Sequence, residues 1–476
     1  MVGTTLRPFV VVVTNSSGVP VAGVDVTFTV TAGGGTVPGG SPQLVTTDSQ
    51  GVASITLTLG ATGGTNTVTA TATGLSGSPL TFNAAAIGTF VPIITTVAGS
   101  ASTTSSGDGG PATSAGLAYA YGLAVDAAGN FYVSDTVGNR IRKIDTNGTI
   151  TTVAGTGTAS FSGDNGTATS ATISGPEGLT IDGAGNLYFS DFNNNRIRKV
   201  NGTTGIITTV AGNGTATFSG DNGLATSASL SSPKDVTVDR FGNLYIADSA
   251  NTRVRKVDTS GIITTVAGNG SQSSTGDGGL AIAAGMSAFA VAVDAAGNIY
   301  IADSNRIRKV DTSGIINTIA GNGSGGSSGD GGLAISATLS TSQGVTVDAA
   351  GNLYFADTIP NARVRKIDTL GIINTVAGDG TTTFKGDGGP ATSASLQFPE
   401  KALVDASGNF LIADGGHNRV RKVTYAGRVS TTSLNSQPGS AVTIPVTLSL
   451  NSGLTDRKST RLNSSHIQKS RMPSSA

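Results

Sequence analysis

Cysteine is absent from the 476 residues, and histidine occurs only twice. The lack of cysteine excludes disulfides, cysteine-based zinc sites and thiol nucleophiles. One histidine, His466, lies in an unpatterned C-terminal tail, which leaves His417 alone in the patterned part of the chain. Histidine triads and clustered-histidine zinc sites are therefore excluded as well.

An excess charge of one sign and long hydrophobic runs are also lacking. The 29 basic residues balance the 29 acidic residues, so no global field attracts nucleic acid or anionic membrane. The apolar run Phe9–Val13 is too short for a signal segment or a membrane span. The chain instead has 69 glycines and short Val, Ile, Thr and Tyr stretches between turn residues, which predicts an all-β protein.

Residues 1–87 alternate apolar and polar side chains between turn signals, a pattern typical of a β-sandwich. The stretch Val19–Phe28, followed by Thr47–Ala53, resembles the bacterial immunoglobulin-like domains of invasin-type surface proteins. The resemblance implies an immunoglobulin-like β-sandwich. The first strand of that family has no counterpart here, so we expect this domain to be truncated at its N-terminus.

A second region, residues 88–433, contains one unit repeated six times. Its marker residues are Asp126, Asp182, Asp239, Asp294, Asp348 and Asp405, at spacings of 56, 57, 55, 54 and 57 residues. In the third copy we predict strands at 235–239, 243–248, 253–257 and 262–267, and four short strands per copy are typical of propeller blades. The signatures Asn186–Asp191 and Asn195–Lys199 resemble NHL repeats. The expected fold is a six-bladed β-propeller of NHL type.

Seven stretches have the sequence of a fourth blade strand. One begins near Ile93, ahead of the first complete copy, and another, Arg428–Thr432, follows the last copy. Either stretch can complete the last blade. Joining the Ile93 strand to the last copy closes the ring with strands from both ends and leaves no unpaired sheet edge.

Two polar elements recur in every copy. The first is an aspartate followed by two arginines, as in Asp135 with Arg140 and Arg142. Six identical copies favour internal charge pairing within each blade over an anion-binding ring. The second is the loop Gly107–Ala112, which has one carboxylate and so does not match a calcium loop. We interpret Asp108 as a cap for a short helical turn.

The copies differ immediately before each inner strand. The residues at these positions are Tyr121, Glu177, Lys234, Phe289, Gln343 and Glu400. Because inner strands line the channel of a propeller, we expect the six side chains to ring one mouth of it and to bind ligand. Neutral variation at exposed turns is the alternative.

The last two segments do not continue the repeat. Residues 434–455 contain the start of a further β-domain, with too few residues to finish it. Residues 456–476 carry five basic residues, one acidic residue and no strand pattern, and they resemble a translated sequencing adapter fused to a truncated gene. We expect this tail to be disordered and artefactual.

The predicted function is a non-catalytic binding or adhesion scaffold of a modular bacterial surface or secreted protein. We expect an extracellular or cell-surface monomer that presents one propeller face to protein or glycan ligands, with no cofactor, metal, nucleic-acid partner or membrane insertion. His417 is expected in an exposed turn of the last blade. The resemblance also implies an alternative, because related propellers include metal-dependent lyases and calcium lactonases. Nucleic-acid binding is a third hypothesis, which the charge balance disfavours. The fold alone does not decide among them.

Overall fold

The structure is a computed structural model, which describes residues 9–14, 19–59, 64–73, 78–86, 91–405 and 408–425. The described residues divide into two compact units, one ending at Val91 and the other spanning Pro92–Tyr425. The predicted segments 434–455 and 456–476 lie outside the described residues, and so does the candidate strand at Arg428–Thr432.

The described part of the N-terminal unit forms two antiparallel sheets. Strand β1 (Phe9–Val12) pairs with β4 (Val52–Ile55), and the second sheet has the order β3 (Gln43–Thr46), β2 (Asp25–Ala32), β5 (Gly64–Thr71) and β6 (Leu80–Ala86). Val11 of β1, Phe28 of β2 and Val68 of β5 are buried in one apolar cluster, so the two sheets share a core. The immunoglobulin-like assignment of residues 1–87 stays a prediction.

Six further sheets make up the second unit. In chain order the sheets are β8 (Ala120–Val125), β9 (Phe131–Asp135), β10 (Arg140–Ile144) and β11 (Ile150–Ala154); β12 (Pro176–Ile181), β13 (Leu187–Asp191), β14 (Arg196–Val200) and β15 (Ile207–Ala211); β17 (Pro233–Val238), β18 (Leu244–Asp248), β19 (Arg253–Val257) and β20 (Ile262–Ala267), with the short β16 (Gly223–Leu224) at the edge; β21 (Ala288–Val293), β22 (Ile299–Asp303), β23 (Arg306–Val310) and β24 (Ile316–Ala320); β25 (Ser342–Val347), β26 (Leu353–Asp357), β27 (Arg363–Ile367) and β28 (Ile373–Ala377); and β29 (Pro399–Val404), β30 (Phe410–Asp414), β31 (Arg419–Thr424) and β7 (Ile93–Ala98).

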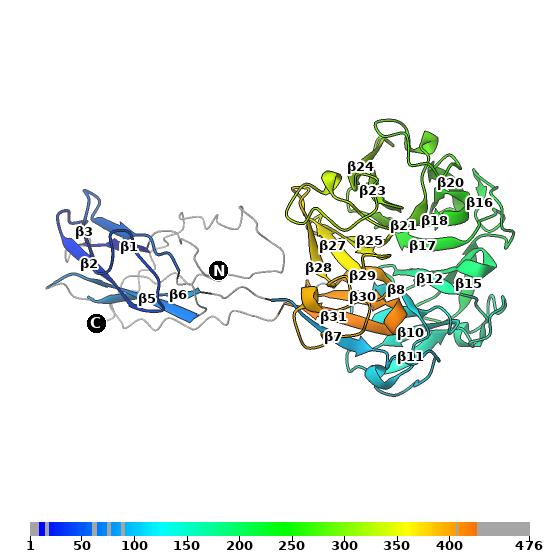
Figure 1. Cartoon of the computed structure of the whole chain (residues 1–476), viewed down its shortest axis with the longest axis horizontal. Helices are drawn as coiled ribbons and strands as arrows, with labels where there is room; N and C mark the ends of the chain where they lie inside the picture. Colours follow the sequence, from blue (N-terminus) through cyan, green and yellow to red (C-terminus); the bar gives the residue numbers. More distant parts are fainter. Residues whose placement is uncertain are drawn as a thin grey trace, which may run out of the picture. The chain divides into compact units, whose positions relative to one another are not determined.

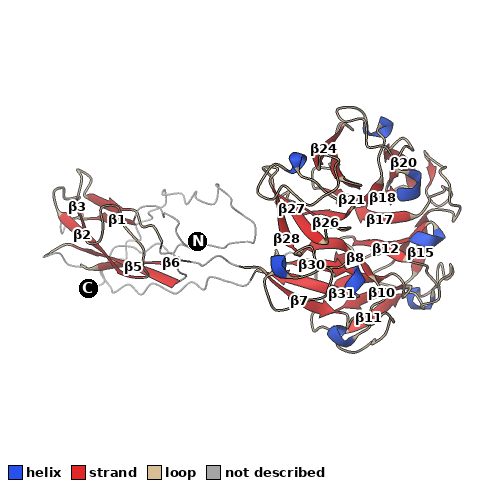
Figure 2. Ribbon diagram, viewed as in Figure 1, coloured by secondary structure: helices blue, strands red, loops and turns tan. Residues whose placement is uncertain are grey.

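The described helices are all single 3-10 turns. They are η1 (Ala112–Ser114), η2 (Ala168–Ser170), η3 (Phe192–Asn194), η4 (Ser249–Asn251), η5 (Ala281–Ala283), η6 (Ala334–Ser336), η7 (Ala391–Ser393) and η8 (Gly415–His417). Strands dominate the described part of the chain, as Figure 2 shows. The composition therefore predicted the all-β class correctly.

The first strands of the six sheets, β8, β12, β17, β21, β25 and β29, are the inner strands, and each contacts the next one around the ring. Strand β29 in turn contacts β8 (Figure 1). The apolar cores lie between neighbouring sheets, since Ile141 of β10 and Phe189 of β13 belong to the same buried cluster. Repeated four-stranded sheets in this arrangement are consistent with the predicted propeller.

The sheet that contains both ends of this unit is completed by β7. Its register with β31 places Ile93 opposite Thr424 and Ala98 opposite Val420. Of the two strands that could complete the last sheet, the one at Ile93 is therefore the strand used. It covers an edge of β31 that would otherwise expose unpaired backbone groups.

We expect the propeller to depend on β7. A chain that starts at Pro92 should unfold cooperatively, whereas a chain that starts at Gly99 should melt at a lower temperature and aggregate. The shorter chain loses the pairing with β31 and the side chain of Ile94, which is 0% exposed. Burial of one such isoleucine contributes about 2 kcal/mol. Circular dichroism melting and gel filtration compare the two chains, and equal stability of both would contradict this account.

The marker aspartates build the turn between the first two strands of each sheet. Asp126 Oδ1 accepts hydrogen bonds from the backbone N–H groups of Ala128 (3.0 Å) and Asn130 (2.9 Å). Its Oδ2 accepts from Asn130 Nδ2 (2.8 Å) and the Tyr132 hydroxyl (3.2 Å). One carboxylate thus satisfies a whole turn, which explains why Asp, Asn and Tyr recur together in the sequence.

Charge pairing within each sheet is present, and the arginine involved is the second of each set. The six pairs are Arg142–Asp135, Arg198–Asp191, Arg255–Asp248, Arg308–Asp303, Arg365–Asp357 and Arg421–Asp414, at 3.1–3.4 Å. All six arginines are at most 1% exposed, and all six aspartates are 0% exposed. These groups are therefore part of the core and are not available to a dissolved anion.

Two details of the prediction were wrong. Arg140 does not pair with Asp135, because its guanidinium donates to the carbonyl oxygens of Gly138 and Thr156. Asp108 makes no side-chain capping bond to η1, and instead contacts Arg142 Nη2 (2.8 Å) and the Thr152 hydroxyl (2.7 Å). The buried guanidinium needs a second acceptor, and the glycine loop supplies it.

Candidate functional site

The six divergent residues occupy the second position of the six inner strands, within the strands and not before them as predicted. They therefore lie at one level of the channel. Four are buried, with 8% of Tyr121, 9% of Glu177, 9% of Gln343 and 4% of Glu400 exposed. Lys234 and Phe289 are half-buried. The four buried residues therefore do not lie in exposed turns, whereas ligand binding by the six residues stays a prediction.

One contact among these residues joins inner strands that are not neighbours, and another joins neighbouring ones. The Tyr121 hydroxyl on β8 donates to Gln343 Oε1 on β25 (3.1 Å). The Lys234 Nζ lies 5.1 Å from the ring centre of Phe289, a cation–π contact between β17 and β21. Tyr121 therefore connects β8 and β25, which lie two sheets apart in the ring of six.

Tyr119 joins this group from the segment just before β8. Its hydroxyl donates to Glu400 Oε1 on β29. We call the seven residues the mouth cluster: Tyr119, Tyr121, Glu177, Lys234, Phe289, Gln343 and Glu400. The backbone of Tyr119 has a φ of 68°, in the left-handed region. The sequence analysis did not indicate Tyr119. A signal was present, because the other tyrosines of the repeat recur beside the marker aspartates, whereas Tyr119 and Tyr121 do not.

A buried ion pair lies one residue further along the inner strands. Lys401 Nζ on β29 contacts Asp235 Oδ2 (2.9 Å) and Oδ1 (3.2 Å) on β17, three sheets away. Asp235 is 2% exposed and Lys401 is 6% exposed. The other four copies have Gly122, Gly178, Ala290 and Gly344 at this position. A Cβ on Gly122 would overlap the Glu177 carbonyl oxygen, so small residues let the inner strands approach closely.

Burial perturbs the acids of the mouth cluster. It raises the pKa of Glu177 to about 8; the Glu400 charge adds to this rise, whereas Lys234 and the nearby Tyr121 hydroxyl oppose it. Burial likewise raises the pKa of Glu400 to about 7, against the opposing effects of Tyr119 and Lys234. The pKa of each tyrosine, Tyr119 and Tyr121, also rises because of burial and nearby carboxylates. Perturbed acids in a channel are typical of functional sites.

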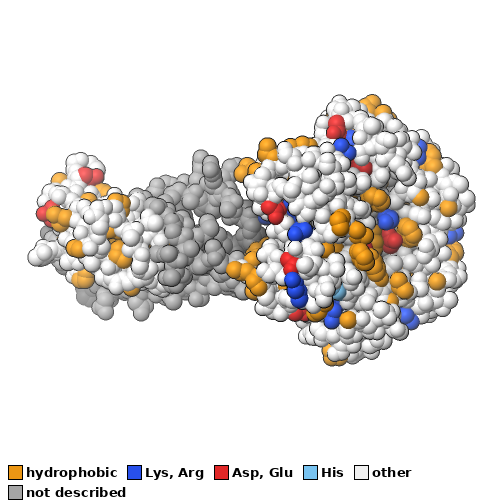
Figure 3. Space-filling view, viewed as in Figure 1, with side chains coloured by type: hydrophobic (Ala, Val, Ile, Leu, Met, Phe, Trp, Pro, Cys, Tyr) orange, Lys and Arg blue, Asp and Glu red, His pale blue; other side chains and the backbone are white. Residues whose placement is uncertain are grey.

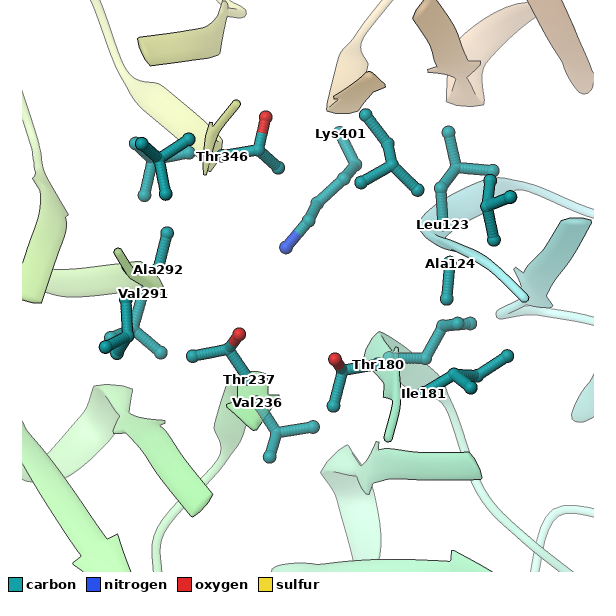
Figure 4. A pocket seen from close by; sticks show the side chains of 16 residues that line it. Leu123, Ala124, Thr180, Ile181, Val236, Thr237, Val291, Ala292, Thr346 and Lys401 are labelled. Carbon is teal, nitrogen blue, oxygen red and sulfur yellow. The ribbon is translucent and has the colours of Figure 1, made fainter. Parts of the chain in front are cut away.

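Beyond the Asp235–Lys401 pair, the channel contains a cavity of about 220 Å³. It is lined by the later residues of all six inner strands, mainly Val, Leu and Ile. Figure 4 shows the Lys401 side chain extending into it, and Thr180, Thr237 and Thr346 also line it. The Thr346 hydroxyl donates to the Ala402 carbonyl oxygen (2.7 Å). The channel therefore has a charged, aromatic layer at the mouth cluster and, behind it, a layer of mainly aliphatic residues with three threonines and Lys401.

His417 lies in η8, and its predicted exposure was wrong. The side chain is 8% exposed, with Nδ1 2.9 Å from Asp414 Oδ2 and Nε2 2.9 Å from the Thr382 carbonyl oxygen. Asn194 makes the same pair of contacts in the second sheet, to Asp191 and the Ser160 carbonyl. His417 is thus a structural substitute for an asparagine and does not belong to the mouth cluster.

The repeated unit matches a known family of repeats. The family model described as "Teneurin NHL domain" matches residues 98–162, 214–275, 270–328 and 323–385. The unit is an NHL-repeat domain. Mouse Teneurin-4 is 29% identical over 338 residues, which cover 63% of this chain and 12% of that protein. Human Teneurin-1 is 29% identical over 277 residues, which cover 50% of this chain and 10% of that protein. The chain thus spans about a tenth of the length of these relatives.

Solved structures share the fold of the NHL-repeat domain. A protein of unknown function from Bacteroides thetaiotaomicron has a TM-score of 0.55 at 18% identity, covering 84% of this chain and 90% of that chain. An auxiliary nutrient binding protein from the same organism has a TM-score of 0.52 at 16% identity, covering 84% and 91%. At such low identity the likeness concerns the fold alone.

Two further properties concern the described residues. They contain no group of three or more His, Cys, Asp or Glu side chains placed to hold a metal ion. Within the same ranges, no helix has the length and apolar character needed to cross a membrane.

Proposed function

We propose that the chain is a non-catalytic binding module of a modular bacterial surface or secreted protein, and that ligand docks at the mouth cluster. The observation that carries this proposal is that the six copies have different residues at the second position of the inner strand. The only two glutamates of the chain, Glu177 and Glu400, occupy equivalent positions on β12 and β29. Tyr121, Lys234 and Phe289 occupy the same position on other inner strands.

Architecture alone does not require such divergence. The buried arginine pairs and the marker aspartates are repeated in all six sheets, as a scaffold needs. Different polar and aromatic side chains at one structurally equivalent position are what recognition of an asymmetric ligand needs. The same fold occurs in an auxiliary nutrient binding protein, so the fold is compatible with ligand binding.

The surface around the channel is mixed in charge. On the face shown in Figure 3, basic and acidic side chains are scattered among uncharged atoms, and neither sign gathers in one large patch. A protein or glycan ligand suits this surface better than nucleic acid, which favours a basic stripe. We therefore keep protein or glycan as the ligand class and an extracellular or cell-surface location as part of the proposal.

Phe289→Ala is expected to weaken binding at least about tenfold, because half-buried aromatic residues are common energetic centres of recognition surfaces. Glycan and protein arrays probed with the full chain identify the ligands, and calorimetry measures the affinities. Phe241→Ala is the matched control, since Phe241 is 66% exposed and lies beyond the opposite end of β17. Equal losses in both variants, or no loss in Phe289→Ala, would contradict a ligand at the mouth cluster.

A lactonase or lyase is the second candidate, favoured by the raised pKa values of Glu177 and Glu400, since acids that titrate near neutral pH suit proton transfer. Turnover of lactones in the presence of Ca²⁺ or Mg²⁺, lost in Glu177→Gln, would replace the binding proposal with this one.

A further inference from the structure

The charges at the mouth of the channel do not balance. The carboxyl groups are Glu177, Glu400 and Asp235, and the amines are Lys234 and Lys401. Lys401 is engaged by both oxygens of Asp235. Lys234 lies over the Phe289 ring and, among the described ion pairs, forms none with either glutamate. The mouth cluster itself therefore has two carboxyl groups and one amine.

Each glutamate also has an oxygen without a hydrogen-bond partner in the described structure. These atoms are Glu177 Oε2 and Glu400 Oε2, in side chains whose residues are only 9% and 4% exposed. The Tyr119 hydroxyl already serves the other oxygen of Glu400. A buried carboxylate oxygen without a donor is costly. When both glutamates are ionised, the site thus has spare acceptors and spare negative charge, and it lacks donors.

We propose that the mouth cluster binds a primary ammonium group, which donates to Glu177 and Glu400 together. This inference rests on the proposed function, because it names the chemistry of the ligand at the same site. An ammonium group is compact, carries a positive charge and has three donors that point in different directions. It can therefore donate to one oxygen of Glu177 on β12 and to one oxygen of Glu400 on β29.

Other donors fit less well. A guanidinium group donates through a planar fork, which matches both oxygens of one carboxylate. Here one oxygen of Glu400 is already occupied by Tyr119. Neutral sugar hydroxyls supply donors but leave the extra negative charge uncompensated. The half-buried Phe289 ring offers an apolar surface for the methylene groups that carry an alkyl ammonium.

Binding of the ammonium group should displace protons from the site. Without ligand, Glu177 and Glu400 retain protons near neutral pH because they are buried. The groups that face Glu177 are Lys234, Glu400, Asp235 and the Tyr121 hydroxyl. The groups that face Glu400 are Lys234 and Tyr119. An alkyl ammonium remains charged up to about pH 10. Affinity should therefore rise with pH between 6 and 9, as the two carboxyl groups become ionised.

Calorimetry with the full chain and Nα-acetyl-lysine amide tests the inference. Binding should be at least about tenfold tighter at pH 9 than at pH 6, from ionisation of a group with a pKa near 8. It should be lost with the Nε-acetylated probe, which keeps the shape but not the charge. Glycine amide and butylamine distinguish a chain terminus or a small amine from a lysine side chain, and tight binding of either one equally supports an ammonium site.

Glu177→Gln and Glu400→Gln should each weaken binding of the lysine probe at least about tenfold. Asp25→Asn is the control for lost negative charge, because Asp25 is exposed on β2 of the N-terminal unit. The inference is overturned if the acetylated probe binds as well as the charged one, or if both glutamine variants bind normally. Array ligands that still depend on Phe289 would then leave the proposed function intact, whereas loss of that dependence would remove both.

Discussion

Asp191→Ala is expected to reduce the free energy of unfolding by about 3–5 kcal/mol, because three donors, including the buried Arg198 Nη1, lose their acceptor. Arg198 and Asp191 are both 0% exposed, with Arg198 Nη1 3.1 Å from Asp191 Oδ2. The carboxylate also accepts from the Ser174 N–H (2.7 Å) and Asn194 Nδ2 (2.8 Å). Removal of this carboxylate leaves all three donors without their acceptor. Thermal and urea unfolding of the full chain measure the loss.

Asp164→Ala is the matched control for that experiment. Asp164 contacts the same guanidinium at 2.7 Å, but its side chain is 31% exposed, so water can replace it. We expect a loss of about 1 kcal/mol. If Asp191→Ala is as stable as Asp164→Ala, or if it stays stable and loses ligand, the repeated buried Arg–Asp pairs do not stabilise the sheets as described above.

The second large effect is a dependence of stability on pH that originates at Glu177. In the unfolded chain a glutamate titrates near pH 4.3, whereas burial raises the pKa of folded Glu177 to about 8. Between these values the folded state holds a proton that the unfolded state has released. Stability therefore falls as pH rises through this window and levels off above about pH 8, with a total change on the order of a few kcal/mol.

Glu177→Gln should flatten this pH profile, because glutamine stays neutral at all pH values. Glu400→Gln should flatten it less and over a window that ends near pH 7, where the pKa of Glu400 lies. Chemical unfolding at pH 5, 7 and 9 measures both effects, with Asp25→Asn as the control for a lost charge. A wild-type profile that does not fall between pH 5 and 9 would contradict the proposed protonation of these acids.

Local pattern predicted the fold well. Strands expected at 243–248, 253–257 and 262–267 correspond to β18, β19 and β20 within one residue. Each strand is specified by its own alternation and bounded by its own turn, so nearby residues carry the information. Repetition adds to this, because six in-phase copies average out the ambiguity of any single copy.

Contacts between distant residues were not predictable in the same way. Asp235 and Lys401 are 166 residues apart, and nothing local to either one indicates the other. The buried role of His417 depends on the Thr382 carbonyl, 35 residues earlier. A signal did exist for the mouth cluster, since divergence between copies indicated six of its seven residues. Extending that comparison by one position would have found Asp235 and Lys401 among glycines and alanine.

The pairing of β7 with β31 has a mechanical consequence. Ile93 lies opposite Thr424, so the chain enters and leaves the NHL-repeat domain side by side. Tension applied through the two flanking segments is therefore carried by this one strand pair and bypasses the other five sheets. Because the strands are antiparallel and both flanks leave from the same end, the hydrogen bonds break one after another, as in unzipping, and not all at once. Within a modular protein under load, the β7–β31 seam would be the first part of the ring to open.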